Sequence, residues 1–112
     1  MAHIIDSKIF GSGWATPELK ELFDDVTMTR DWLEIMAVLA EIQAEFGLIP
    51  DSAAEGIRDG IHRLVLDQAF FSEVEKGYRA TNHSLLGLIR AVKNACPGES
   101  GEWLCYGATV QD

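Results

Sequence analysis

The chain has few basic residues, few cysteines and no long apolar run. Nine Lys and Arg stand against 18 Asp and Glu, which gives a formal net charge of −9. A surface this acidic repels phosphate backbones and argues against nucleic acid as a partner. Cys96 and Cys105 lie nine positions apart and match no metal-ligand spacing, so no metal is expected. Two reduced thiols are favoured over a disulfide.

The missing apolar run also limits where the chain can act. The N-terminal stretch MAHIIDSKIF contains a His, an Asp and a Lys and lacks the apolar centre of a signal peptide. No segment reaches the length of a membrane span, so we expect a cytoplasmic location and no membrane partner. Hydrophobic residues make up 47% and charged residues 24% of the 112 positions, the balance of one soluble globular domain.

Helical periodicity fills the first half of the chain after an irregular start over residues 1–15. Thr16 as N-cap and Pro17 at the first helical position predict a short helix that ends near Asp24 or Asp25. A second helix follows over residues 29–46, which Gly47 ends and Pro50 forbids from continuing. Its large apolar stripe comprises Trp32, Ile35, Met36, Leu39, Ile42 and Phe46, and its neighbours widen the stripe enough for two buried faces.

Three further helices are expected in the second half. Ser52 and Glu55 form a capping box that opens the third helix. Gly56 and Gly60 either weaken this helix or permit close approach of another. The fourth helix runs from about 67 to 79 and the fifth from about Asn82 to 95, each with an apolar stripe. Residues 97–101 form a loop, residues 102–106 are short enough to be extended, and no strand pair is convincing, so the domain is predicted to be all-α.

Three stretches could carry chemistry, and each also has a structural explanation. In YRATNHSLLGLIRAV, Arg79, Thr81 and His83 gather where one helix ends and the next begins, which favours an anion; alternatively Asn82 caps the helix and the others are solvated. In GATVQD, Thr109 begins a helix whose free N–H groups could hold a carboxylate, or it opens an ordinary capped helix. GSGW near the N-terminus could meet a ligand or form a flexible arm. His3 and His62 are predicted to be surface residues.

These stretches together resemble a known family. The block EVEKGYRATNHSLLGLIRAVKNACPGESGEWLCYGATVQD is similar to a continuous block of the fumarase/aspartase superfamily of lyases, in its adenylosuccinate lyase and 3-carboxy-cis,cis-muconate cycloisomerase branch. That branch carries Thr-x-His-Asp on a helix and, after a similar gap, His-x-Gly-x-Thr-Ser-x-Asp at the start of a long helix. The upstream segments ATPELKELFDD and EFGLIP fit as well, so the resemblance covers nearly the whole chain.

The resemblance implies an N-terminal helical domain over residues 1–112, cut off where the central bundle begins. It implies a lyase or isomerase that eliminates an amine or oxygen group β to a carboxylate, a dicarboxylate-type substrate, no cofactor and a homotetramer in the full-length protein. The catalytic serine loop would lie downstream, so no catalytic residue lies in this chain and the chain alone would be inactive. The substrate-binding residues carried over by motif or by neighbourhood are Arg79, Thr81, His83, Cys105 and Thr109.

Three positions depart from the family pattern. Ser84 stands in place of the first motif's Asp, Cys105 in place of the second motif's His, and Val110 in place of its Ser. A thiol cannot act as a cationic imidazole, and Val110 lacks a hydroxyl for an anionic group. The substrate therefore differs from adenylosuccinate, or the fold serves another activity. The alternative is a small acidic helical module that binds a protein partner and catalyses nothing.

Overall fold

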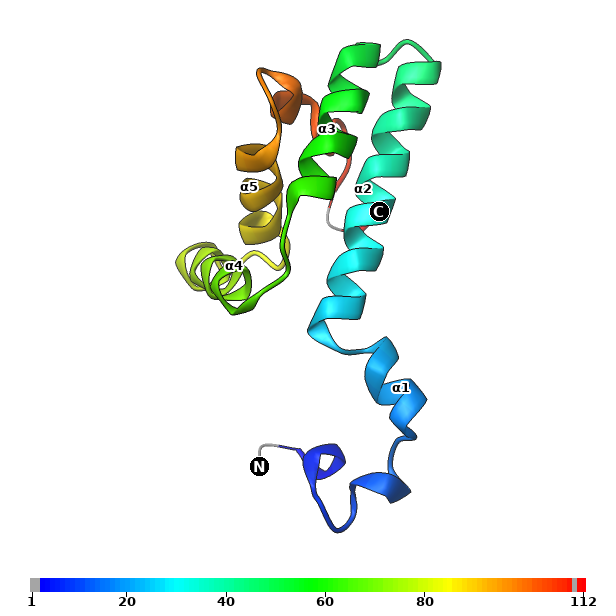
Figure 1. Ribbon diagram of the computed structural model, residues 1–112, viewed down its shortest axis with the longest axis vertical. Helices are drawn as coiled ribbons and strands as arrows, with labels where there is room; N and C mark the ends of the chain where they lie inside the picture. The colour runs from blue at the N-terminus through cyan, green and yellow to red at the C-terminus, as the bar shows by residue number, and fades with distance from the viewer. Residues whose placement is uncertain (1–2, 110) are drawn as a thin grey trace. The chain divides into compact units, whose positions relative to one another are not determined.

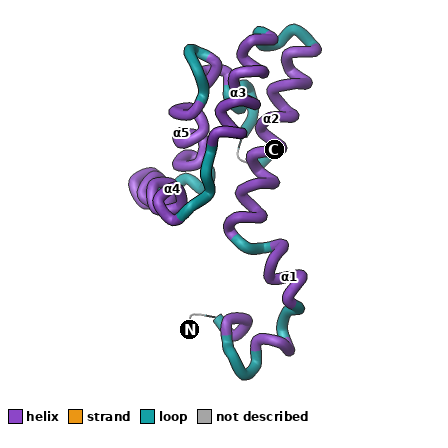
Figure 2. The backbone as a smooth tube through the Cα atoms, in the orientation of Figure 1, coloured by secondary structure: helices purple, strands orange, loops and turns teal. Residues whose placement is uncertain are grey.

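The described part of the chain is built from helices and turns. The structure, a computed structural model, describes residues 3–109 and 111–112. Within these residues no strand is present, which confirms the all-α prediction (Figure 2). The α-helices of the described residues are α1 (Pro17–Leu22), α2 (Asp25–Glu45), α3 (Asp51–Arg63), α4 (Gln68–Thr81) and α5 (Leu86–Ala95), and the 3-10 helices are η1 (Ile4–Asp6), η2 (Gly11–Gly13) and η3 (Ser100–Trp103) (Figure 1).

The chain divides into two compact units, Met1–Trp32 and Leu33–Asp112, each described by itself. In the first unit, η1 and η2 occupy the stretch expected to be irregular. They pack closely because Gly11 has no side chain: a Cβ there would lie 2.6 Å from the carbonyl oxygen of Ile5. The predicted start of α1 is confirmed, since Thr16 Oγ1 accepts the N–H of Leu19 at 3.3 Å and Pro17 is the first helical residue.

The end of α2 follows the prediction for Gly47. This glycine adopts a left-handed backbone (φ 72°), which a residue with a side chain disfavours. Its N–H donates to the carbonyl of Ala44 at 3.0 Å, and the N–H of Leu48 donates to the carbonyl of Gln43 at 2.8 Å. These two bonds form a Schellman motif, so the carbonyls of the last turn are satisfied before the chain reverses into α3.

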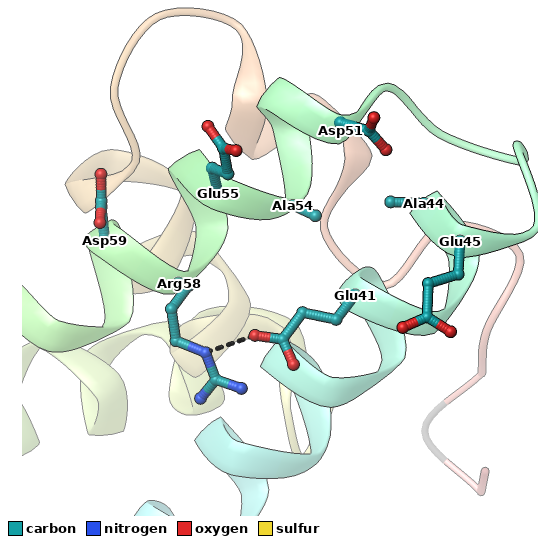
Figure 3. A pocket seen from close by; sticks show the side chains of 8 residues that line it. All are labelled: Glu41, Ala44, Glu45, Asp51, Ala54, Glu55, Arg58 and Asp59. Atoms are coloured by element: carbon teal, nitrogen blue, oxygen red, sulfur yellow. Dashed lines mark hydrogen bonds and ion pairs between the residues drawn. The ribbon is translucent and has the colours of Figure 1, made fainter.

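The face of α2 that enters the core differs from the predicted stripe. Of the six large residues expected to be buried, only Met36 is fully buried; Leu39 is half-buried, and the other four are exposed. The buried face instead combines Leu33 and Met36 with small residues, Ala37 and Ala40. Small side chains let α3 come close, and Ala44 and Ala54 point toward one another across the pair (Figure 3). Ile35, Ile42 and Phe46 of the predicted stripe lie outside the core of the second unit.

The start of α3 corrects the predicted capping box. Pro50 is the N-cap, and its carbonyl accepts the N–H groups of Ala53 and Ala54 at 3.0 and 3.3 Å. No side chain caps this helix, because Asp51 is already helical and places Ser52 inside the first turn. The local Ser-x-x-Glu spacing is correct, but proline's extended conformation sets the boundary two residues earlier than the box requires.

Gly56 and Gly60 allow other helices to approach α3 closely, which confirms one of the two predictions made for them. Each packs against the segment that follows α5. A Cβ at Gly60 would lie 2.8 Å from Cys96 Sγ, and a Cβ at Gly56 would collide with the side chain of Ser100. The glycines therefore allow α3 to contact the end of α5 and η3. Residues 102–106 are not extended, because the first two belong to η3 and the other three form a turn.

The crossing of α4 and α5 also depends on glycine. A Cβ on Gly77 would lie 2.5 Å from the Cα of Gly87, and a Cβ on Gly87 would collide with the carbonyl of Val74. In Figure 1, α4 runs across the start of α5, while α5 lies beside α3. The buried core is formed by α2, α3, α5 and the segments next to them, and α4 contributes none of its residues. Its members are Leu33, Met36, Ala40, Ile49, Ala53, Ala54, Ile57, Leu88, Val92 and Leu104.

Candidate functional site

The corner between α4 and α5 holds three of the predicted site residues. α4 starts where predicted, with Asp67 Oδ1 accepting the N–H of Phe70 at 2.8 Å. It ends at Asn82, whose backbone is left-handed (φ 53°) and whose N–H donates to Tyr78 at 2.7 Å. Asn82 therefore ends α4 and does not open α5, which begins four residues later than expected. The sequence pattern could not separate these roles, because asparagine favours both helix ends.

His83 takes over the capping role at the start of α5. Its Nδ1 accepts the N–H groups of Leu85 and Leu86 at 3.3 and 3.1 Å. Because Nδ1 acts as an acceptor, the proton of the neutral ring lies on Nε2. His83 is exposed, so Nε2–H is available to donate a hydrogen bond to an oxygen of a bound molecule. The same imidazole can thus shape the corner and bind a ligand.

Arg79 and Thr81 lie four and two residues before His83 in the chain. The Thr81 hydroxyl donates to the carbonyl of Gly77 at 2.7 Å and accepts the N–H of His83 at 3.3 Å. Arg79 pairs with Glu75 one turn earlier, at 2.7 Å between Nη2 and Oε1, and its side chain is exposed. Exposed pairs of this kind contribute little, so an anion could compete with Glu75 for the guanidinium.

The second group of predicted residues lies in the segment after η3. Gly107 makes the expected tight turn with φ 71°. Thr109 donates both its N–H and its hydroxyl to Asp112 Oδ2, at 2.7 and 3.2 Å, and its carbonyl accepts the N–H of Asp112. The sequence predicts that Thr109 begins a helix, but none of the described residues from 108 onward is helical. Val110, named above as a departure, lies outside the described residues.

The side chain of Cys105 is not fully exposed to solvent, as a residue that binds substrate in an open cleft would be. It is half-buried, packs against the core and has a left-handed backbone (φ 54°). Burial raises the pKa of the Cys105 thiol, and also that of Cys96, above the ordinary value. Cys105 is therefore a protonated thiol at neutral pH, with weak donor capacity and no charge. Both cysteines are free, as expected.

The two groups of predicted site residues are not joined by hydrogen bonds among the described residues. Within the described residues, no hydrogen bond joins Arg79, Thr81 or His83 to the segment from Cys105 to Asp112. That segment is held instead by Gln43, whose Nε2 donates to the carbonyl of Tyr106 at 2.7 Å. Gln43 Oε1 is buried and has no hydrogen-bond partner among the described residues. A shared cleft between His83 and Thr109 stays a prediction.

Sequence reasoning missed an open pocket between α2 and α3. Its volume is about 440 Å³, and it contains none of the predicted site residues (Figure 3). Arg58 crosses it to bind Glu41 through Nε and Glu34 through Nη1, each at 2.7 Å. This pairing lowers the pKa of Glu41 and raises that of Arg58. Its acidic lining consists of Glu41, Glu45, Asp51, Glu55 and Asp59.

The charge of this pocket excludes it as the site for a dicarboxylate. Arg58 is its only cationic lining residue among those described, and two glutamates already engage that guanidinium. An added carboxylate would face like charges. Among residues 3–109 and 111–112, no three His, Cys, Asp or Glu side chains gather as metal ligands would. The sequence shows the carboxylates on both helices. It does not show that α2 and α3 place them opposite one another, which depends on the tertiary structure.

Comparison with known proteins places this geometry in a family. No family model matches the chain. The chain is 34% identical over 99 residues to adenylosuccinate lyase from Methanocaldococcus jannaschii, an alignment that covers 88% of this chain and 21% of that enzyme. A crystal structure of fumarate lyase from Mesorhizobium sp. BNC1 superposes on 87% of this chain with a TM-score of 0.76 at 27% identity and covers 22% of that structure. The chain belongs to the fumarase/aspartase superfamily of lyases.

Further similarity within this superfamily extends along almost the whole chain. N-acetyl-S-(2-succino)cysteine lyase from Enterococcus italicus is 32% identical over 111 residues, which is 99% of this chain and 24% of that enzyme. The chain thus spans between a fifth and a quarter of the length of these relatives. None of the helices in the described residues combines the length and apolar character needed to cross a bilayer.

Proposed function

We propose that these 112 residues act as the N-terminal domain of a longer lyase that eliminates a group β to a carboxylate. The observation that carries the proposal is the alignment of nearly the entire chain with two such lyases, together with the order of the two motif-like segments. The proposed protein is cytoplasmic, forms a homotetramer and requires no cofactor. The alternative activity within the same superfamily is that of a cycloisomerase that acts on a muconate-type acid.

The proposed substrate carries two carboxylates. The names of both relatives contain a succinic acid unit, and the second name attaches it through carbon 2 to the sulfur of cysteine. Elimination from such a compound removes a proton next to a carboxylate and expels the amine or thiol, leaving an unsaturated diacid. Cys105 supplies a neutral thiol where the family pattern has His, so the leaving group is expected to differ from that of adenylosuccinate.

The chain's own residues would bind the substrate and leave proton transfer to other segments. His83 would donate from Nε2 to a carboxylate oxygen, with Arg79 nearby to provide charge after releasing Glu75. Thr81 would hold the position of His83 through the bond to its N–H. Thr109 would contribute its hydroxyl after giving up Asp112, and Cys105 would line the same cleft. Without the serine loop, the 112-residue chain would be inactive.

The experiment that tests this proposal is a turnover assay with two proteins. The complete open reading frame and the 112-residue chain are each incubated with adenylosuccinate, N-acetyl-S-(2-succino)cysteine and 3-carboxymuconate, and release of unsaturated diacid or lactone is followed. The longer protein should convert at least one compound, and the short chain should convert none. Activity in the short chain would place the base within it. A stop codon directly after Asp112 would favour the small interaction module.

A further inference from the structure

The outward face of α2 is apolar in a helix that already has a buried face. Ile35, Ile42 and Phe46 are 59%, 45% and 78% exposed, and Val38 lies beside them. Phe46 continues the helical path, since its N–H donates to the carbonyl of Ile42 at 3.1 Å. The opposite face is filled by Leu33, Met36, Ala37 and Ala40 in the core. Two apolar faces on one helix indicate two packing partners.

The spacing of the outward residues shows what kind of partner fits. Ile35, Leu39, Ile42 and Phe46 are separated by four, three and four positions, the repeat of a coiled-coil seam. At about 100° per residue, they fall within one narrow stripe that contains no charged residue. A seam of this spacing accepts the side chains of a second helix at a shallow crossing angle. A flat or irregular partner would leave alternate positions unfilled.

The charges beside this seam bear on which helix could occupy it. Glu34, Glu41 and Glu45 follow one edge of the stripe, and the chain as a whole carries −9. A second copy of the chain would bring its own three glutamates to the contact and a further net charge of −9 to the assembly. The family relatives, by contrast, have three quarters or more of their length outside the part that matches this chain, since the matching part is 21% and 24% of them.

We propose that the seam formed by Ile35, Leu39, Ile42 and Phe46 is the docking surface for a helix from the remainder of the longer protein. The proposal rests on the proposed function for the existence of that longer protein. The docked helix has apolar residues in the same four-three repeat, and a basic residue at the edge that meets Glu45. Docking covers Phe46, the most exposed of these side chains, and ties α2 to the rest of the enzyme.

Two matched substitutions test this surface. Ile42→Lys places a charge in the seam, and Val65→Lys makes the same kind of change at a site that is 70% exposed between α3 and α4. Each is introduced into the 112-residue chain and into the complete reading frame, and the melting temperature is measured. In the short chain neither should shift it by more than about 2 °C. In the longer protein, Ile42→Lys should lower it by at least about 5 °C more than Val65→Lys.

Equal shifts for the two variants in the longer protein would overturn the proposal. So would a short chain that sediments as a dimer and becomes a monomer with Ile42→Lys, because the seam would then serve a second copy. The turnover assay separates this inference from the proposed function. A longer protein that converts none of the compounds but is destabilised by Ile42→Lys removes the function and keeps the surface. Turnover with equal melting shifts removes the surface and keeps the function.

Discussion

At the scale of single residues, His83 combines a structural contact with a free donor on one ring. His83→Asn should preserve the first and remove the second, because an asparagine oxygen can accept the amide N–H groups that Nδ1 accepts now. In the proposed longer enzyme we expect an unchanged melting temperature and a kcat/KM reduced by up to about ten-fold, because the proposed hydrogen bond to the substrate is lost.

His83→Ala is the control for this prediction. It removes both functions, so stability should fall by about 1 kcal/mol as well, measured by urea unfolding. Full activity in His83→Asn would mean that Nε2 does not contact the substrate, and the site would lose its principal donor.

Cys105 offers a second test at this scale. Because burial raises the pKa of its thiol, little thiolate is present at neutral pH. Iodoacetamide should therefore modify Cys105 of the folded chain at least about ten-fold more slowly than in urea, as followed by mass spectrometry at pH 8. Cys96, packed against Gly60, should behave alike. Equal rates in the folded and unfolded chain would identify an exposed thiol.

At the scale of elements, the contact between α4 and α5 depends on the absence of side chains. Gly87→Ala should lower the free energy of unfolding by about 2 kcal/mol, because its methyl group collides with the carbonyl of Val74 and the backbone must move. This loss exceeds the gain of about 1 kcal/mol that alanine brings to a helix interior. Urea denaturation measures the difference.

Gly13→Ala provides the matched control, since nothing lies within 4 Å of a Cβ at that position. Its free energy of unfolding should stay within about 0.5 kcal/mol of the wild-type value. An equal, small effect at both glycines would show that α4 and α5 can separate without cost, and the described crossing would be wrong.

The pair of α2 and α3 is joined by Arg58. Its side chain is only 23% exposed, and it binds Glu34 and Glu41, which lie about two turns apart on α2. Arg58→Met keeps much of the aliphatic stem and removes the charge, so we expect a loss of about 1 kcal/mol in urea unfolding. Lys76→Met breaks an exposed pair within α4 and should cause no measurable change. Equal effects of the two variants would contradict a joining role for Arg58.

At the scale of the whole molecule, the shifted groups predict how stability depends on pH. Arg58 lowers the pKa of Glu41 in the folded state, so this stabilisation is present above the unfolded value of 4.5 and is lost as the pH falls through the folded value. The raised pKa values of Cys96 and Cys105 act at the other end: their contribution is present below the unfolded value of 9.0 and is lost as the pH rises through the folded value.

Unfolding by urea from pH 3 to pH 10 should therefore give greatest stability near neutrality. Arg58→Met should flatten the acid side of the curve, and Cys105→Ala should flatten part of the alkaline side. An acid side unchanged by Arg58→Met would show that other carboxylates govern it.

Local sequence alone determined the helical class, the family resemblance, the starts of α1 and α4 and the end of α2, whereas α2 and α3 begin earlier and α5 later than predicted. Thr16, Gly47 and Asp67 act through bonds that reach at most a few residues along the chain, so their patterns are readable without tertiary structure. The family resemblance also rests on residue types in order. The free state of the two cysteines and the choice of candidate site residues near His83 also rest on residue types and spacing, so both could be predicted from the sequence.

Only the tertiary structure decided which surfaces meet. Periodicity marks an apolar face but does not show what covers it. The sequence predicts Ile35, Ile42 and Phe46 in the core, whereas Leu33, Ala37 and Ala40 lie there beside Met36. Asn82 suits either helix end, and the packing of α4 on α5 selected one. The acidic pocket and the close contacts at Gly56 and Gly60 join residues far apart in the chain. Contacts of that kind are absent from any local pattern because they form only when the helices pack.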